Sequence, residues 1–217
     1  MPAAPKPSAG SLSRRTFTSA LALGAAAAAA PAQALVRRAA KETILGEGEH
    51  VFRAVHHFPQ LPDRYTWQTT HGVAVDAAGN LYVIHEGRKD QKDHPSIFVF
   101  DTDGKFVRAF GSQFQGGGHG IEVRKEEGGE FLYVCAYQQV KAFAKLTLDG
   151  ETVWYRKAPM ESGFYAPGED VSTTPTWSRQ GFLPTNVAFL DDGGFLLADG
   201  YGTFKIHRYD KEAKWTG

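Results

Sequence analysis

The sequence predicts an all-β protein, a β-propeller built from four-stranded antiparallel blades. Three stretches repeat one pattern: an apolar strand, a turn rich in glycine or charge, a second apolar strand, and a following pair of strands. In the first two stretches an Asp-Gly turn joins that pair, as in many hairpins. None of the stretches shows sustained helical periodicity. The composition agrees, because 15 phenylalanines and 8 tyrosines favour strands, and 24 glycines favour tight turns.

The repeats begin at equivalent positions, which are His71, His119 and Asn186. The first spacing matches a propeller blade of roughly 40–50 residues. The second is longer, and its surplus falls in residues 156–181, which are rich in Pro, Gly, Ser and Thr. We expect that segment to be a surface loop over one face of the propeller, either functional or an inert excursion. The predicted blades are therefore 70–112, 113–157 and 182–217.

Residues 35–69 precede the first repeat. We expect a polar lead-in over 35–42 and an edge strand over His50–Phe58, where side chains alternate. In closed propellers such an N-terminal strand often completes the last blade. Propellers usually close with about four to eight blades, whereas three blades leave open apolar edges that pair with other chains. We therefore expect part of a longer propeller; the alternative is a small open-sheet protein that closes by dimerising.

Residues 1–34 have the order of a twin-arginine (Tat) export signal. Arg14 and Arg15 precede an apolar run that extends to Ala30, and Ala32 and Ala34 supply the small residues of a cleavage site. The run is too short and alanine-rich to anchor well in a bilayer core of about 30 Å. We expect a periplasmic or extracellular protein without a stable membrane span after cleavage. The alternatives are a membrane-anchored N-terminus or a chance arginine pair.

The charge balance and the cysteine count exclude several classes of protein. Lysine and arginine total 24, as do aspartate and glutamate, whereas a nucleic-acid binder needs a basic excess. A single cysteine excludes an intramolecular disulfide framework and a cysteine-rich zinc site. Cys135 lies in an apolar run, so we expect a packed small hydrophobe.

His71 and His119 share a register at the head of the first strand of their repeats. The first strand of a propeller blade lines the central channel, so adjacent blades would aim both imidazoles at one axis. Imidazole nitrogen is a good zinc ligand, which makes a metal site at this position reasonable. The alternative is that these polar side chains line a wet channel and bind nothing.

The repeats resemble the NHL-type six-bladed propeller. More narrowly, they are similar to the peptidyl-α-hydroxyglycine α-amidating lyases over about residues 70–210. The segments that carry this resemblance are Val73–Asp76, Asn80–Gly87, His119–Ile121, Pro184–Phe189 and Ala198–Tyr201. The resemblance implies cleavage of the C–N bond of a hydroxyglycine-extended peptide, which releases an amide and glyoxylate. It also implies a channel zinc held by three histidines and a structural calcium.

Several positions match functional residues of that family. The resemblance makes His119 a zinc ligand, Tyr201 the catalytic tyrosine, and the carbonyls of Val73 and Ile121 calcium ligands; His71 is suggested by its register alone. Where the family has an arginine that binds the substrate carboxylate, this chain has Glu86, which would repel that carboxylate.

Three functions remain open at this point. We expect a secreted, NHL-type propeller on a lyase-like scaffold that binds a peptide, a glycan or another partner. The alternative is a zinc-dependent amidating lyase. The third is a lactone hydrolase on the same scaffold that uses calcium and a histidine.

Overall fold

The computed structural model describes residues 43–88 and 90–217 and divides the chain into two compact units at Ala54. The predicted signal 1–34 and the polar lead-in 35–42 lie outside the described residues. The first unit contains an antiparallel hairpin of β1 (Thr43–Glu47) and β2 (His50–Ala54). The predicted edge strand therefore ends at Ala54 rather than at Phe58, and it pairs with β1. Beyond it the chain turns through His57 at φ 59° towards Pro59, which has no N–H for a ladder.

The second unit consists of three antiparallel sheets whose strands pair in chain order, as the sequence predicts. The first sheet contains β3 (Thr70–Val75), β4 (Leu81–His85), β5 (Ile97–Phe100) and β6 (Phe106–Phe110). The second contains β7 (Gly118–Glu126), β8 (Gly129–Ala136), β9 (Ala142–Thr147) and β10 (Thr152–Arg156). The third contains β11 (Asn186–Phe189), β12 (Phe195–Ala198) and β13 (Ile206–Tyr209).

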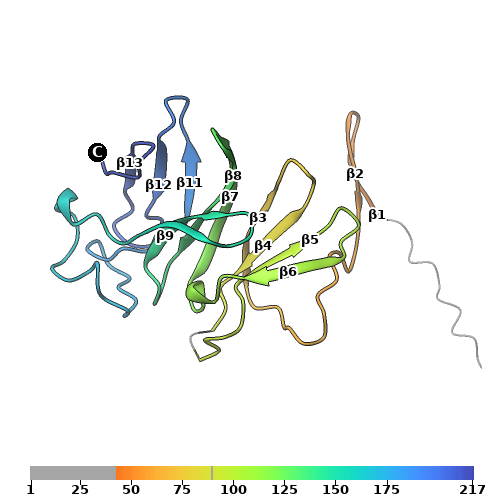
Figure 1. Cartoon of the computed structure of the whole chain (residues 1–217), viewed down its shortest axis with the longest axis horizontal. Helices are drawn as coiled ribbons and strands as arrows, with labels where there is room; N and C mark the ends of the chain where they lie inside the picture. The colour runs from red at the N-terminus through yellow and green to blue at the C-terminus, as the bar shows by residue number, and fades with distance from the viewer. Residues whose placement is uncertain (1–42, 89) are drawn as a thin grey trace, which may run out of the picture. The chain divides into compact units, whose positions relative to one another are not determined.

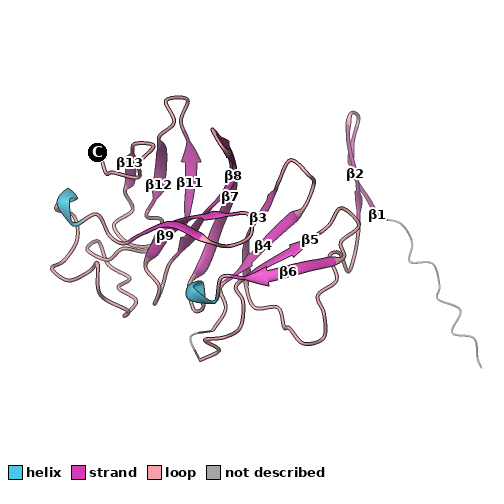
Figure 2. Ribbon diagram, in the orientation of Figure 1, coloured by secondary structure: helices cyan, strands magenta, loops and turns pink. Residues whose placement is uncertain are grey.

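The third sheet also has the start of a fourth strand. Trp215 forms a bridge with Tyr209. The amide of Thr216 donates to the carbonyl of Arg208 at 2.8 Å, and the Arg208 amide donates to Gly217 at 2.6 Å. The described residues otherwise form loops and two single-turn 3₁₀ helices, Ser112–Phe114 and Met160–Ser162 (Figure 2). The prediction of an all-β protein with four-stranded antiparallel blades is therefore confirmed. Within the described residues no helix is long and apolar enough to cross a membrane.

Strand alternation on β8 explains how the sheets pack. Leu132 and Val134 enter the core shared with the first sheet, whereas Tyr133 and Cys135 enter the core shared with the third. The second sheet is therefore buried on both faces, which requires apolar residues at successive positions. Cys135 is fully buried, and burial raises the pKa of its thiol. It is thus a packed small side chain, as expected.

A buried ion pair anchors the long loop between β10 and β11. Lys141, directly before β9, donates from Nζ to Glu169 Oε1 at 2.5 Å and to Thr176 Oγ1 at 3.0 Å. The same Glu169 oxygen accepts the amide of Phe182 at 2.8 Å. Within this loop Val171 and Trp177 are exposed. Its middle is nevertheless fixed to the second sheet.

Buried histidines make the fold sensitive to acid. His85 is fully buried, accepts the amide of Gln68 at Nδ1 and donates from Nε2 to the carbonyl of Pro95. Burial lowers the pKa of His85 to about 4. Below pH 6.5 His85 binds a proton in the unfolded chain, whereas in the folded chain it stays neutral until about pH 4. The free energy of unfolding therefore falls as the pH drops through this window. The titration of His85 alone lowers the free energy of unfolding by about 3 kcal/mol across this window.

We expect the urea midpoint to fall steeply between pH 7 and pH 4.5. Burial also lowers the pKa values of His119 and His207, which add to the effect in the same direction. A His85→Gln variant cannot take up the proton and should give a shallower profile of unfolding free energy against pH. A flat profile for the original chain would contradict the prediction.

Candidate functional site

The candidate side chains gather at one end of the three sheets, and strand pairing explains why. In an antiparallel pair the start of the first strand lies beside the end of the second. Here Thr70 is opposite His85, Gly118 is opposite Ala136, and Asn186 is opposite Ala198. The residues that begin the repeats, His71, His119 and Asn186, therefore lie near the residues that follow β4, β8 and β12. In Figure 1, β7 lies between β3 and β11, and it contacts both.

The His-Gly pairs allow the first strands to approach closely. A Cβ added to Gly72 would lie 2.9 Å from the carbonyl oxygen of His119, and one added to Gly120 would lie 2.2 Å from that of Thr185. As a result, the imidazoles of His71 and His119 stack with centroids 4.3 Å apart and an interplanar angle of 15°. The structure thus brings together the two histidines that share a register.

His119 is held as a neutral acceptor. Its Nδ1 donates to the carbonyl of Thr185 at 2.9 Å, which leaves the lone pair on Nε2. The Nε2 atom is buried and has no hydrogen-bond partner among the described residues. Burial lowers the pKa of His119, so its ring is neutral at pH 7. This ring therefore offers one unused acceptor to a ligand.

Glu86 is the anionic group of the site. Its Oε2 accepts the hydroxyl of Tyr137 at 2.8 Å, its Oε1 accepts Nε2 of Gln138 at 2.8 Å, and His71 Nε2 lies 3.5 Å from Oε2. Burial raises the pKa of Tyr137 to about 12, so its hydroxyl remains a donor at neutral pH. The Glu86 carbonyl accepts the three consecutive amides of residues 116–118, which fix the backbone. The side chain is still 24% exposed and accessible to a ligand.

Three aromatic rings adjoin Glu86 and His119, and we call them the aromatic cluster: Tyr137, Trp177 and Tyr201. The ring centroid of Tyr201 lies 5.5 Å from that of Tyr137 and 5.6 Å from that of Trp177. The centroids of Tyr137 and Trp177 are 6.0 Å apart. Tyr201 is also edge-on to His119 at 5.7 Å. Tyr137 is buried, whereas Tyr201 is 41% and Trp177 58% exposed. The cluster therefore presents aromatic surface to solvent.

All the residues proposed from the sequence lie at this end of the sheets. His71, Val73, His119 and Ile121 line one cavity of about 250 Å³, and Tyr201 contacts the His119 ring. Sequence reasoning missed Tyr137, Gln138 and Trp177. The first two directly follow β8, at the position that Glu86 takes after β4, so register could have found them. Trp177 lies in the loop, where no periodicity identifies it.

The side chains at this end supply one suitable metal ligand, His119, but not a complete zinc site. His119 has the arrangement of a metal-binding histidine, with one nitrogen fixed by a carbonyl and the other free. However, no group of three or more His, Cys, Asp or Glu side chains within 43–88 and 90–217 is placed to hold a metal. The rings of His71 and His119 meet face to face rather than converging through their lone pairs. The calcium ligands expected at Val73 and Ile121 stay a prediction.

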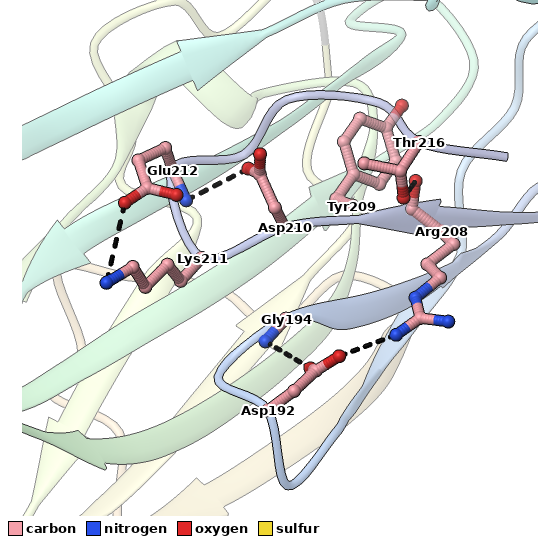
Figure 3. A pocket seen from close by; sticks show the side chains of 8 residues that line it. All are labelled: Asp192, Gly194, Arg208, Tyr209, Asp210, Lys211, Glu212 and Thr216. Atoms are coloured by element: carbon pink, nitrogen blue, oxygen red, sulfur yellow. Dashed lines mark hydrogen bonds and ion pairs between the residues drawn. The ribbon is translucent and has the colours of Figure 1, made fainter.

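A second pocket, of about 400 Å³, lies at the opposite end of the third sheet, near the β11–β12 turn. Figure 3 shows Arg208 reaching towards Asp192, with 2.5 Å between Nη2 and Oδ2, and Lys211 beside Glu212. These side chains are more than half exposed, so each pair contributes little to stability. Because the charged groups of this pocket already pair with each other, we place the candidate site at the histidine end.

Comparisons with known proteins give fold-level likeness only. No protein-family model and no curated protein sequence matches the chain. A protein of unknown function from Bacteroides caccae is 15% identical, with a TM-score of 0.43, over 68% of this chain and 44% of that protein. Virginiamycin B lyase from Staphylococcus aureus is 12% identical, with a TM-score of 0.42, over 68% of this chain and 40% of the lyase. The chain thus spans less than half of either structure.

Proposed function

We propose that the chain is an NHL-type propeller module that binds a peptide or small molecule at the histidine end of its sheets. The observation that carries this proposal is the aromatic cluster. Two of its rings, Trp177 and Tyr201, are exposed, and both contact Tyr137, which bonds to the carboxylate of Glu86. Tyr201 also contacts the ring of His119, whose Nε2 is a free acceptor. Exposed aromatic surface with a few fixed polar groups is typical of binding sites.

Glu86 favours binding over amidating-lyase chemistry. A hydroxyglycine-extended peptide ends in a carboxylate. The amidating lyases, which this chain resembles, bind that carboxylate with an arginine at this position. Here the side chain is a carboxylate that already accepts hydrogen bonds from Tyr137 and Gln138. Two carboxylates at contact distance repel each other, most strongly where water is partly excluded.

We expect short peptides to perturb the aromatic cluster. In a two-dimensional NMR titration with capped dipeptides that differ in charge and aromaticity, the Trp177 indole and the Tyr201 amide should shift. Trp177→Ala and Tyr201→Ala should each weaken binding by about tenfold, the range of an aromatic contact. Phe204→Ala is the matched control, because Phe204 is also exposed but lies outside the cluster. Shifts confined to the Asp192 pocket, or absent for every peptide, would refute the proposal.

The amidating lyase remains the alternative because one observation favours it: the free Nε2 of His119 lies beside Tyr201. Incubation with zinc and a hydroxyglycine-terminated peptide separates the two functions. We expect no glyoxylate above the protein-free blank. Turnover that Tyr201→Phe removes would select the lyase, and calcium-dependent hydrolysis of a lactone would select the third function.

We also propose Tat export for this chain, on the order of Arg14, Arg15, the apolar run and the small residues at 32 and 34. Residues 1–34 fused to a folded reporter should direct it to the bacterial periplasm. Replacing both arginines by lysine keeps the charge and should abolish export, because a Tat signal is defined by its arginine pair. Export that survives the double substitution would exclude the Tat route.

A further inference from the structure

We propose that this site binds an organic cation of the alkylammonium class, with Glu86 as its counter-ion and the aromatic cluster as its apolar wall. The inference rests on the proposed function, because it names the ligand class for the same site. Three features of the described residues support it: the local charge, the kind of hydrogen-bonding groups left free, and the exposed ring faces.

The local charge at the site is negative. The described side chains that hydrogen-bond to Glu86 are those of Tyr137, Gln138 and His71, none of which carries a fixed positive charge. The nearby cavity contains a second carboxylate, Glu122, which accepts a hydrogen bond from Asn186 at 3.0 Å. The described residues that line this cavity include no lysine or arginine. An incoming cation would therefore be attracted and an anion repelled.

The one charged hydrogen-bonding group left free is an acceptor, the carboxylate of Glu86. The donors of Tyr137 and Gln138 are used on Glu86, and Nδ1 of His119 is used on Thr185. What remains for a ligand is the partly exposed carboxylate of Glu86, the buried lone pair of His119 Nε2, and the neutral donors of the exposed Tyr201 and Trp177 side chains. An ammonium group has donors and no acceptor, so it matches such a site. A ligand carboxylate or phosphate has only acceptors, and it finds only the neutral donors of Tyr201 and Trp177 beside the repelling charge of Glu86.

The exposed rings add a second attraction for the same charge. The faces of tryptophan and tyrosine rings carry negative potential, so they attract a cation placed over them. Trp177 and Tyr201 offer such faces next to Glu86, since both rings contact Tyr137, whose hydroxyl bonds to Glu86. The alkyl part of the ligand would cover aromatic surface that is now exposed to water.

A series of ligands with one chain length tests the charge assignment. In isothermal titration at low salt, n-butylammonium should bind at least tenfold more tightly than n-butanol, and butyrate should not bind. Glu86→Gln keeps the size and one acceptor, and it should weaken butylammonium binding at least tenfold while leaving n-butanol unchanged. Glu212→Gln is the matched control, because it removes an exposed carboxylate outside the site.

A second variant guards against a folding defect. Trp177 is exposed in a loop, so Trp177→Ala should keep the melting temperature while weakening butylammonium binding. The inference is wrong if butylammonium fails to bind, if butyrate binds as tightly, or if Glu86→Gln has no effect. If neutral or acidic peptides still shift the aromatic cluster in that case, the proposed binding function stands and only its ligand class falls.

Discussion

Lys141→Met should lower the free energy of unfolding by about 3–5 kcal/mol, the cost of leaving one charge of a buried ion pair without its partner. Lys141 is fully buried and Glu169 is 5% exposed, so water cannot replace the lost ammonium. Methionine keeps the unbranched shape, and the backbone at this residue, with φ 48°, bears the same strain in both chains. Urea unfolding at pH 7 measures the difference.

A double-mutant cycle identifies the cause of that loss. Glu169→Gln in the Lys141→Met background removes the stranded charge and keeps an acceptor for the Phe182 amide. It should therefore restore part of the stability. The matched control is Lys211→Met, because the Lys211–Glu212 pair is exposed and should change stability by less than about 1 kcal/mol. A loss below about 1 kcal/mol for Lys141→Met would contradict the prediction.

The same ion pair connects the loop to the proposed site. Glu169 and Thr176 are both held by Lys141, and Trp177 follows Thr176 directly. Releasing this anchor should therefore displace an indole of the aromatic cluster without altering any residue that contacts Glu86. We expect Lys141→Met to weaken ligand binding even at temperatures where the variant is fully folded.

The sheets could be predicted from the sequence because their signals are local. Apolar alternation and glycine turns specify each hairpin, and the shared register of His71 and His119 predicts that the first strands bring them together. The stack of the two rings follows from that register and from the glycines that succeed them. The packing of neighbouring sheets could also be predicted, because consecutive repeats of a propeller pack on each other.

The parts that escaped prediction depend on contacts between distant residues. Lys141 and Glu169 are 28 residues apart in the chain, and nothing in either flanking sequence pairs them. Trp177 contacts Tyr137 from a loop that Lys141 holds through Glu169 and Thr176. The strand Thr43–Glu47 was missed for a different reason. Its two apolar residues, Ile44 and Leu45, are adjacent, so the segment lacks the alternation of apolar and polar side chains that marks a strand in sequence.

Asp199→Asn should destabilise the third sheet by about 3 kcal/mol or more. Asp199 is fully buried and accepts five hydrogen bonds. They come from the amides of Leu183, Gly202 and Thr203 and from the hydroxyls of Thr203 and Tyr165. An asparagine NH₂ in place of either oxygen would face donors, and each buried group left unpaired costs about 1–3 kcal/mol.

The direction of the neighbouring hydrogen bonds prevents an easy rearrangement. The indole of Trp215 donates to Nδ1 of His207 at 3.2 Å, so His207 carries its proton on Nε2 and donates to the Tyr165 hydroxyl at 2.6 Å. That hydroxyl must then donate to Asp199 at 3.1 Å. If the hydroxyl accepted from asparagine as well as from His207, its own hydrogen would lose its acceptor.

The consequence for the site follows from the position of Tyr201, which lies between Asp199 and the two amides that Asp199 holds at residues 202 and 203. We expect the variant to show faster amide exchange at those two residues and weaker binding at the aromatic cluster. Asp192→Asn is the matched control, because Asp192 also caps a turn through the Gly194 amide but is half exposed. Equal losses of stability in the two variants would show that Asp199 is an ordinary turn residue, and that the order of Tyr201 has another origin.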